Sequence, residues 1–323
     1  MSDTNYTYAV ARTRAMEISL FSRKTIDQLL GCSTKEQCMQ FLNERKWGSG
    51  EITTNAEEML SAEKEKTVGF IGSLVEDLSV FGVLFYPDIF HNLKAAIKKA
   101  VIGEIQGELF IPETKPSGEE IFSLVNSRDF SSLPAYMEEA AKQAYEELVH
   151  TGDGQLCDIM IDRATLQAIY ESGMASNEEI VKNYAEIAVA LANIKIAVRA
   201  SKTGKSASFM EQAMYPCESL DINELKRAAA KGEESIQKYL EGTKYAGGAE
   251  ALKKSPSAFE CWCDNQVIAL IQPQISNPFT IGPLMAYLLA RENEIKTVRI
   301  ILSGKQNGLS EDSIRERVRE MYV

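Results

Sequence analysis

The chain has 323 residues, of which 45% are hydrophobic and 25% charged, a composition typical of globular proteins with two or three domains. Its formal net charge of −11 argues against nucleic acid or unaided binding to anionic lipid and is compatible with a basic protein partner. The six cysteines are too scattered for a disulfide scaffold, and no apolar run is long enough to insert into a membrane. The first residues lack a signal peptide, so we expect a cytoplasmic protein.

Amphipathic helices are predicted along the first hundred residues. Apolar residues recur at intervals of three and four from residue 6 to 42, as on helices that pack on one face. Residues 56–77 are rich in Glu and Lys at spacings typical of a solvent-exposed helix. Pro87 is expected to begin the next helix. Residues 110–118 hold two prolines and a glycine without periodicity, which predicts a linker.

The rest of the chain shows the same helical pattern. Residues 178–200 give the clearest helix, and Ser208 with Glu211 is a candidate capping box for a short helix after it. Pro216 marks another break, and the glycine and proline at 282–283 favour the start of a last long helix. No sustained alternation of apolar and polar residues predicts a sheet.

A polar, aliphatic, basic pattern occurs three times at intervals of about one hundred residues. Each copy has a polar first residue and a glycine eleven residues later: Asn92 and Gly103, Asn193 and Gly204, Thr297 and Gly308. A helix that ends at a glycine in the left-handed conformation explains this spacing. The three copies indicate three related helical units.

Breaks near residues 116 and 216 separate the three copies. We therefore expect an all-α protein of three similar domains, formed by residues 1–116, 117–216 and 217–323.

Two pairs of carboxylates lie four residues apart on predicted helices. They are Asp158 with Asp162 and Glu260 with Asp264. Such pairs can bind a cation or act as acid and base. Because the arrangement is duplicated and the chain has only two histidines, a structural or solvated role is favoured over chemistry.

Two motifs resemble ligand sites at first sight. Thr-Gly-Lys-Ser at 203–206 looks like the end of a phosphate-binding loop, but Arg199 stands where that loop needs its first glycine. Cys261 and Cys263 do not have the spacing of a zinc or thioredoxin-like site, which favours packed thiols. We expect no catalytic residue, no cofactor and no metal.

Arg291 lies within the apolar stripe of the last long helix, three residues before Glu294. We expect its side chain to extend to solvent from the edge of the stripe. The alternative is a buried ion pair that fixes an interface. The candidate structural or partner-contacting residues are Arg291, Glu292, Asn293, Glu294 and Arg299.

Three stretches carry a family likeness. They are AYLLARENEIKTVRIIL at 286–302 with GKQNGL at 304–309, AVARTRAME at 9–17, and IRER at 314–317. Together they resemble the family of the V-type ATPase C subunit, which includes the eukaryotic d subunit. The pattern departs at Thr297, where an asparagine is expected.

The resemblance implies three helical domains in a pseudo-threefold, funnel-like array. Members of the family are non-catalytic. They cap the membrane rotor ring (c/K-type subunits) on its cytoplasmic side and hold the central shaft (D/F-type subunits), which couples ATP to proton or sodium transport. Two alternatives remain, a helical adaptor unrelated to rotary ATPases and an enzyme that uses the carboxylate pairs.

Overall fold

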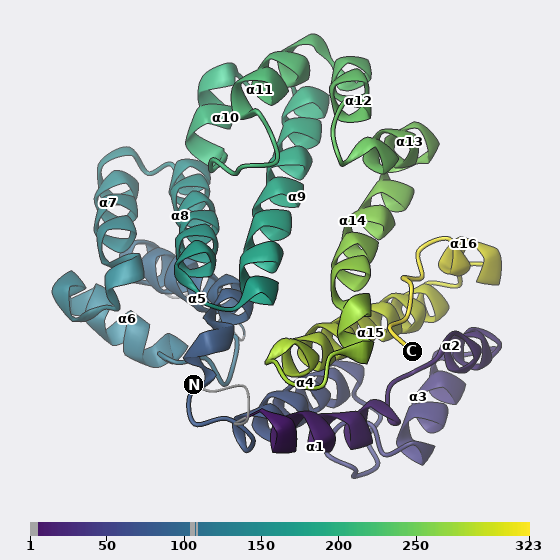
Figure 1. The fold of residues 1–323 in the computed structure, drawn as a ribbon. Coiled ribbons are helices and arrows are strands. Elements are labelled where there is room, and N and C mark those ends of the chain that lie inside the picture. Colours follow the sequence, from purple (N-terminus) through teal and green to yellow (C-terminus); the bar gives the residue numbers. More distant parts are fainter. Residues whose placement is uncertain (1–5, 104–106, 108) are drawn as a thin grey trace. The chain divides into compact units, whose positions relative to one another are not determined.

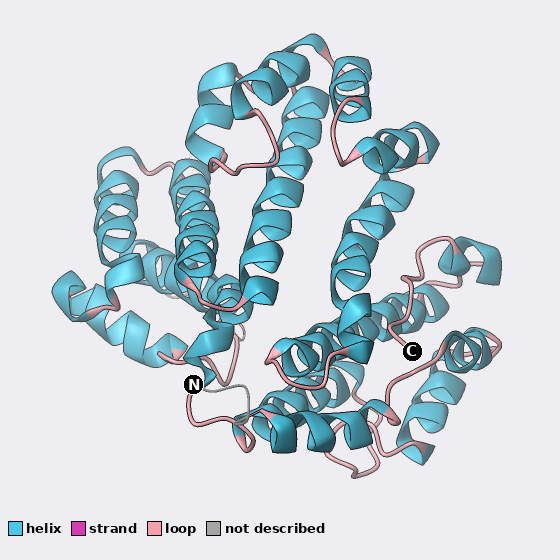
Figure 2. Ribbon diagram, viewed as in Figure 1, coloured by secondary structure: helices cyan, strands magenta, loops and turns pink. Residues whose placement is uncertain are grey.

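The structure, a computed structural model, describes residues 6–103, 107 and 109–323. Figure 2 shows helices joined by loops, and the described residues form no strand, which confirms the predicted all-α class. The α-helices are α1 (Thr7–Glu17), α2 (Arg23–Leu30), α3 (Lys35–Glu44), α4 (Ala56–Gly72), α5 (Gly82–Ile102), α6 (Gly118–Ser127), α7 (Ala135–Thr151), α8 (Gly154–Ala175), α9 (Glu179–Thr203), α10 (Ala207–Ala213), α11 (Ile222–Lys231), α12 (Glu233–Glu241), α13 (Ala246–Lys254), α14 (Pro256–Ile271), α15 (Gly282–Gln306) and α16 (Glu311–Arg315). The 3₁₀ helices are η2 (Leu78–Phe81), η3 (Phe130–Ser132) and η4 (Gln272–Ser276).

The chain forms two compact units. Unit 1 combines both ends of the sequence, Met1–Leu78 and Gly247–Val323, and unit 2 is Ser79–Ala246. This division into two units does not test the predicted three domains with boundaries at 116 and 216, which stay a prediction.

Unit 2 is organised around α5, which packs against α6, α7 and α8 (Figure 1). Its apolar face is fully buried at Leu93, Ala96 and Ile97. The helix begins at Gly82, so the prediction that Pro87 starts it is wrong. Proline removes only one backbone donor there, and burial of the flanking apolar residues holds the helix on both sides.

Unit 1 is organised around α15, which contacts α1, α3, α4 and α14 (Figure 1). The glycine and proline at 282–283 begin this helix, as predicted. Every residue from Gly282 to Arg291 is buried, because neighbouring helices surround this half of α15. The first half of this helix is therefore buried on all sides, whereas the sequence had predicted burial along one apolar stripe only.

Glycines with positive φ follow the three long helices, and Gly204 has the predicted left-handed helical conformation, whereas Gly103, with ψ of −150°, does not. Gly103, Gly204 and Gly308 have φ values of 96°, 64° and 65°. A side chain at these positions would strain the backbone, so glycine suits the chain reversal.

The predicted capping box at Ser208 and Glu211 is wrong. The cap of α10 is Ser206, whose hydroxyl oxygen accepts a hydrogen bond from the Phe209 N–H. A capping box occurs instead at the start of α6, where Ser117 and Glu120 bind each other's backbone N–H.

Candidate functional site

Arg291 is buried inside unit 1, with 2% of its surface exposed. Its Nη1 lies 2.7 Å from Glu294 Oε2, and its Nη2 donates to Ser19 Oγ at 2.7 Å. The prediction that this side chain reaches solvent is therefore wrong, and the buried ion pair is present. The reason is that α4 and the connection between α1 and α2 cover the face of α15 that Arg291 occupies.

Glu63 on α4 is the second carboxylate at this arginine. Its Oε1 lies 3.4 Å from Arg291 Nε, and its Oε2 accepts the Gly48 N–H at 2.8 Å and pairs with Lys66. The predicted helix at 56–77 was expected to be exposed, but one face of α4 is buried. The high Glu and Lys content of this helix obscured its buried face in the sequence. From Leu60 onward the buried residues recur at intervals of three or four: Met59, Leu60, Glu63, Thr67 and Ile71.

Aromatic rings enclose this ionic network. The Arg291 guanidinium carbon lies 5.8 Å from the Trp47 ring centroid and 5.7 Å from that of Tyr287. Trp47 in turn stacks on Phe21, with centroids 5.0 Å apart. The rings exclude water and attract the cation through their faces, so the charges interact more strongly than they would at the surface.

Glu294 is the most perturbed acid of the network. Burial raises its pKa to about 7, and Glu63 adds to the rise, while Arg291 and the Phe21 N–H oppose it. The Phe21 N–H donates to Glu294 Oε1 at 2.5 Å. Glu294 therefore fixes the connection between α1 and α2 to α15.

The network joins four separate segments of unit 1. Ser19 and Phe21 belong to the connection after α1, Gly48 to the loop after α3, Glu63 to α4, and Glu294 to α15. In each of these contacts a side chain of the network binds another protein side chain or a backbone N–H. This arrangement suits a structural role better than catalysis, because a reacting group needs access to substrate.

Buried asparagines on two long helices hold the segments that follow those helices. Asn92 accepts the Ile111 N–H at 2.7 Å and donates to the Ile111 carbonyl at 2.9 Å. Asn193 makes the same two bonds to Tyr215, at 3.2 and 2.7 Å. The predicted linker at 110–118 is thus anchored to α5 at its start.

Asn293 of α15 makes one of these two bonds, as a donor only. It donates to the Glu320 carbonyl at 2.8 Å, in the segment after α15. The predicted equivalent, Thr297, lies one helical turn later, and its hydroxyl is buried without a hydrogen-bond partner among the described residues. Thr297 matches Asn92 and Asn193 in its complete burial, whereas Asn293 makes a related hydrogen bond, so the predicted register stays a prediction.

Three of the four carboxylates of the predicted pairs, Asp158, Asp162 and Asp264, form ion pairs with neighbouring segments. Lys98 Nζ lies 2.6 Å from Asp158, and Lys94 Nζ lies 2.5 Å from Asp162. These contacts join α5 to α8 and agree with the structural interpretation.

Asp264 has the corresponding role in unit 1. Its carboxylate lies 2.8 Å from both Lys296 and Arg319. Burial alone would raise the pKa of Asp264, but the two cations lower it below its usual value.

The remaining candidate residues of α15 face solvent. Arg299 Nη2 lies 2.9 Å from Glu57 on α4, and both side chains are well exposed. Glu292 is exposed on the same helix. The structure therefore brings Arg291 and Glu294 together, places Asn293 at the segment after the helix, and leaves Glu292 and Arg299 at the surface.

The two motifs that resembled ligand sites have structural explanations. Gly204 ends α9 and Ser206 caps α10, much as Gly308 and then Ser310, the cap of α16, follow α15. Cys263 is buried on α14, and Cys261 Sγ lies 3.4 Å from the Val318 carbonyl oxygen. Across residues 6–103, 107 and 109–323, no cluster of three metal-binding side chains occurs.

None of the helices in the described part of the chain is long and apolar enough to cross a membrane.

Comparison with known proteins identifies the family. Residues 9–317 match the model of the ATP synthase (C/AC39) subunit. The C subunit of the V-type sodium ATPase of Enterococcus hirae is 22% identical over 320 residues, which cover 96% of each chain. The C subunit of the A-type ATP synthase of Methanocaldococcus jannaschii is 24% identical over 344 residues, 96% of this chain and 85% of that protein. That of Halorubrum lacusprofundi is 23% identical, with 98% of each chain covered. The chain thus belongs to the ATP synthase (C/AC39) subunit family, the family of the C subunits of V-type and A-type ATPases.

Proposed function

We propose that this chain is a non-catalytic central-stalk subunit of a rotary V/A-type ATPase. In this role it is a socket that couples the central shaft, made of D- and F-type subunits, to the membrane rotor ring of c- or K-type subunits. The observation that carries the proposal is the family match over residues 9–317, with C subunits of rotary ATPases that align over nearly their whole lengths. The chain would lie on the cytoplasmic face of the membrane, held there by the ring.

The asparagine anchors support a threefold repeat within this socket. Asn92, Asn193 and Asn293 lie about one hundred residues apart, and each binds backbone further along the chain, at Ile111 after α5, Tyr215 after α10 and Glu320 after α16. Three helices that share this device suit a pseudo-threefold, funnel-like array of three similar domains. In this proposal the domain boundaries lie near residues 116 and 216.

Tight internal packing supports the transmission of torque. A compliant element in a rotor stores torque as strain, whereas close-packed helices deform little. In unit 1 the buried charges of Arg291, Glu294 and Glu63 tie several segments to α15. These contacts suit a part that transmits force without changing shape.

Measuring transport beside hydrolysis tests the proposal. The rotary complex is reconstituted into vesicles with and without this chain, and ATP-driven ion pumping is recorded together with ATP hydrolysis. We expect loss of the chain to abolish most of the pumping per ATP hydrolysed, and adding it back to restore coupling. Unchanged pumping per ATP without the chain would overturn the socket proposal.

A further inference from the structure

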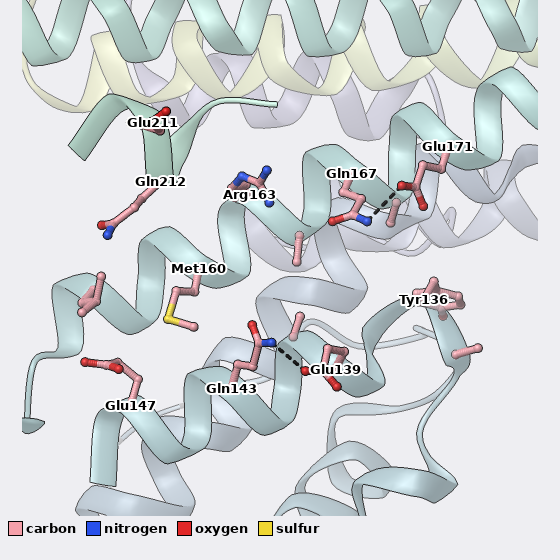
Figure 3. A pocket seen from close by; sticks show the side chains of 15 residues that line it. Tyr136, Glu139, Gln143, Glu147, Met160, Arg163, Gln167, Glu171, Glu211 and Gln212 are labelled. Carbon is pink, nitrogen blue, oxygen red and sulfur yellow. Dashed lines mark hydrogen bonds between the residues drawn. The ribbon is translucent and has the colours of Figure 1, made fainter. Parts of the chain in front are cut away.

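A groove of about 600 Å³ runs along unit 2 between α7 and α8, with α10 at its upper edge (Figure 3). On α7 the residues that pack in the core, among them Met137 and Ala141, differ from those that line the groove. On α8, Ala164 and Ala168 line the groove and also pack in or against that core, so the groove reaches down to it. Its α7 wall extends from Ala135 to Glu147, about 18 Å at 1.5 Å per residue. That length matches three turns of a bound helix.

Small and apolar side chains also line the groove. They include Ala140 of α7 and Ala164 and Ala168 of α8, which we call its alanine floor. Met160 extends from α8 toward α7 (Figure 3). Alanines let another backbone approach closely, and methionine adapts its shape to what it contacts. Tyr136 closes one end, and its ring packs on that of Tyr86 with centroids 4.8 Å apart.

The walls of the groove are acidic. Glu139 and Glu147 line the α7 side, Glu171 the α8 side, and Glu211 comes from α10, against the single cation Arg163 among the described lining residues. Glu211 is partly neutralised by Lys226, whose Nζ lies 3.6 Å from it, so the excess rests on Glu139, Glu147 and Glu171. Arg163 Nε donates to the Met214 carbonyl at 3.2 Å, which draws that charge toward the backbone beside α10. The groove therefore presents an excess of negative charge.

The polar groups of the two walls bind within their own helices or, for Glu171, also to Tyr215 after α10, whose hydroxyl donates to it at 2.8 Å. Gln143 donates to Glu139 at 2.6 Å within α7, and Gln167 donates to Glu171 at 2.9 Å within α8 (Figure 3). Among the described lining residues, no hydrogen bond or ion pair crosses from the α7 wall to the facing wall. The walls can therefore accept a third element without breaking contacts between them.

We propose that this groove binds a basic amphipathic helix of a partner protein. Lysines or arginines at the edges of that helix would pair with Glu139 and Glu147, and its small or aliphatic face would rest on the alanine floor. This is the helix-in-groove mode of recognition, with charge selecting the partner.

A defined peptide tests the proposal with the full chain. The probe is a labelled 15-residue helical peptide with lysines on one face and alanine and leucine on the other, and its binding is followed by fluorescence anisotropy. We expect Glu139→Lys with Glu147→Lys to weaken binding by tenfold or more. The control is Glu138→Lys with Glu146→Lys, which makes the same charge change one residue earlier on exposed positions of α7 and should alter binding less than twofold. Equal loss in both variants, or no binding to the wild type, would overturn the proposal.

A second measurement identifies the occupant in the assembled complex. A photo-crosslinking residue at Gln143 should capture a segment rich in lysine and arginine on another polypeptide. Capture of a second copy of this chain, of lipid, or of an acidic segment would overturn the proposal. The peptide assay needs no rotary complex, so its outcome is independent of the socket proposal.

Discussion

Two arginines on α15 carry the same charge in opposite surroundings. Arg291 lies buried between Glu63 and Glu294, whereas Arg299 pairs with Glu57 at the surface. Removing Arg291 leaves Glu294 buried without a cation and Glu63 with Lys66 alone, so Arg291→Ala should cost about 3–5 kcal/mol of unfolding free energy. Arg299→Ala should cost about 1 kcal/mol or less. Urea unfolding of both variants checks this, and similar losses would contradict the assignment of the buried pair.

Glu294 should make the stability of unit 1 depend on pH. Its pKa is raised to about 7 in the folded protein, whereas a glutamate in an unfolded chain titrates near ~4.3. The folded state thus holds this proton more tightly. That contribution to stability is fully present below about pH 4.3 and is lost as the pH rises through 7.

The corresponding experiment compares wild type with Glu294→Gln. Because the variant cannot ionise, we expect wild-type stability to fall relative to it between pH 5 and 8, measured by urea unfolding at each pH. If the wild type and Glu294→Gln lost stability in parallel across this pH range, Glu294 would have the same pKa in the folded and unfolded states, which would contradict the prediction.

At the scale of one helix, the asparagine anchors predict local effects. Asn193→Ala leaves the N–H and carbonyl of Tyr215 without their partner, which should cost about 1–3 kcal/mol for each group that stays unsatisfied. Hydrogen exchange at the Tyr215 amide should accelerate more than exchange in α5. Unchanged protection of that amide would mean that other contacts hold the segment.

Thr297→Val is the matching test of the repeat register. The Thr297 hydroxyl is buried and makes no hydrogen bond in the described structure, so an isosteric apolar group should change stability by about 1 kcal/mol or less, in either direction. Asn293→Ala, one turn earlier, should be clearly more harmful. The reverse order would support Thr297 as the equivalent of Asn92 and Asn193.

Local sequence signals predicted the helices and their ends well. Proline, glycine and serine act on backbone within a few residues, so the start of α15 and the glycines after α5 and α9 followed from the sequence alone. The sequence also suggested that Arg291 and Glu294 could pair, since residues three apart on a helix share a face. Its burial was not predictable, because Glu63 and Ser19 approach from distant parts of the chain.

The repeat register shows the limit of spacing arguments in a different way. Glycine spacing selected Thr297, since Gly308 lies eleven residues after it, as Gly103 does after Asn92. Burial and glycine spacing favour Thr297 as the equivalent of Asn92 and Asn193, whereas the hydrogen bond to Glu320 favours Asn293. The Thr297→Val and Asn293→Ala variants decide between the two.

At the scale of the molecule, unit 1 depends on both parts of the sequence that form it. Ile26 and Leu29 of α2 share one apolar cluster with Val298 and Ile301 of α15. We expect separately expressed residues 1–78 and 79–323 to copurify as a complex, because each fragment alone exposes its side of that cluster. Size-exclusion chromatography of the coexpressed fragments checks this. A stable, monomeric 79–323 fragment that ignores 1–78 would contradict it.

The pairing of α2 with α15 also sets the order of events during synthesis. Ribosomes add about 5–20 residues per second, so α15 and α16 emerge roughly 10–50 s after α4. During that interval the apolar faces of α2, α3 and α4 lack their principal partner, and a chaperone has time to bind them. A chain broken off before α15 cannot complete this unit. Unit 1 can therefore complete its fold only after α15 has been synthesised, so a fully folded unit 1 is evidence that translation has passed that helix.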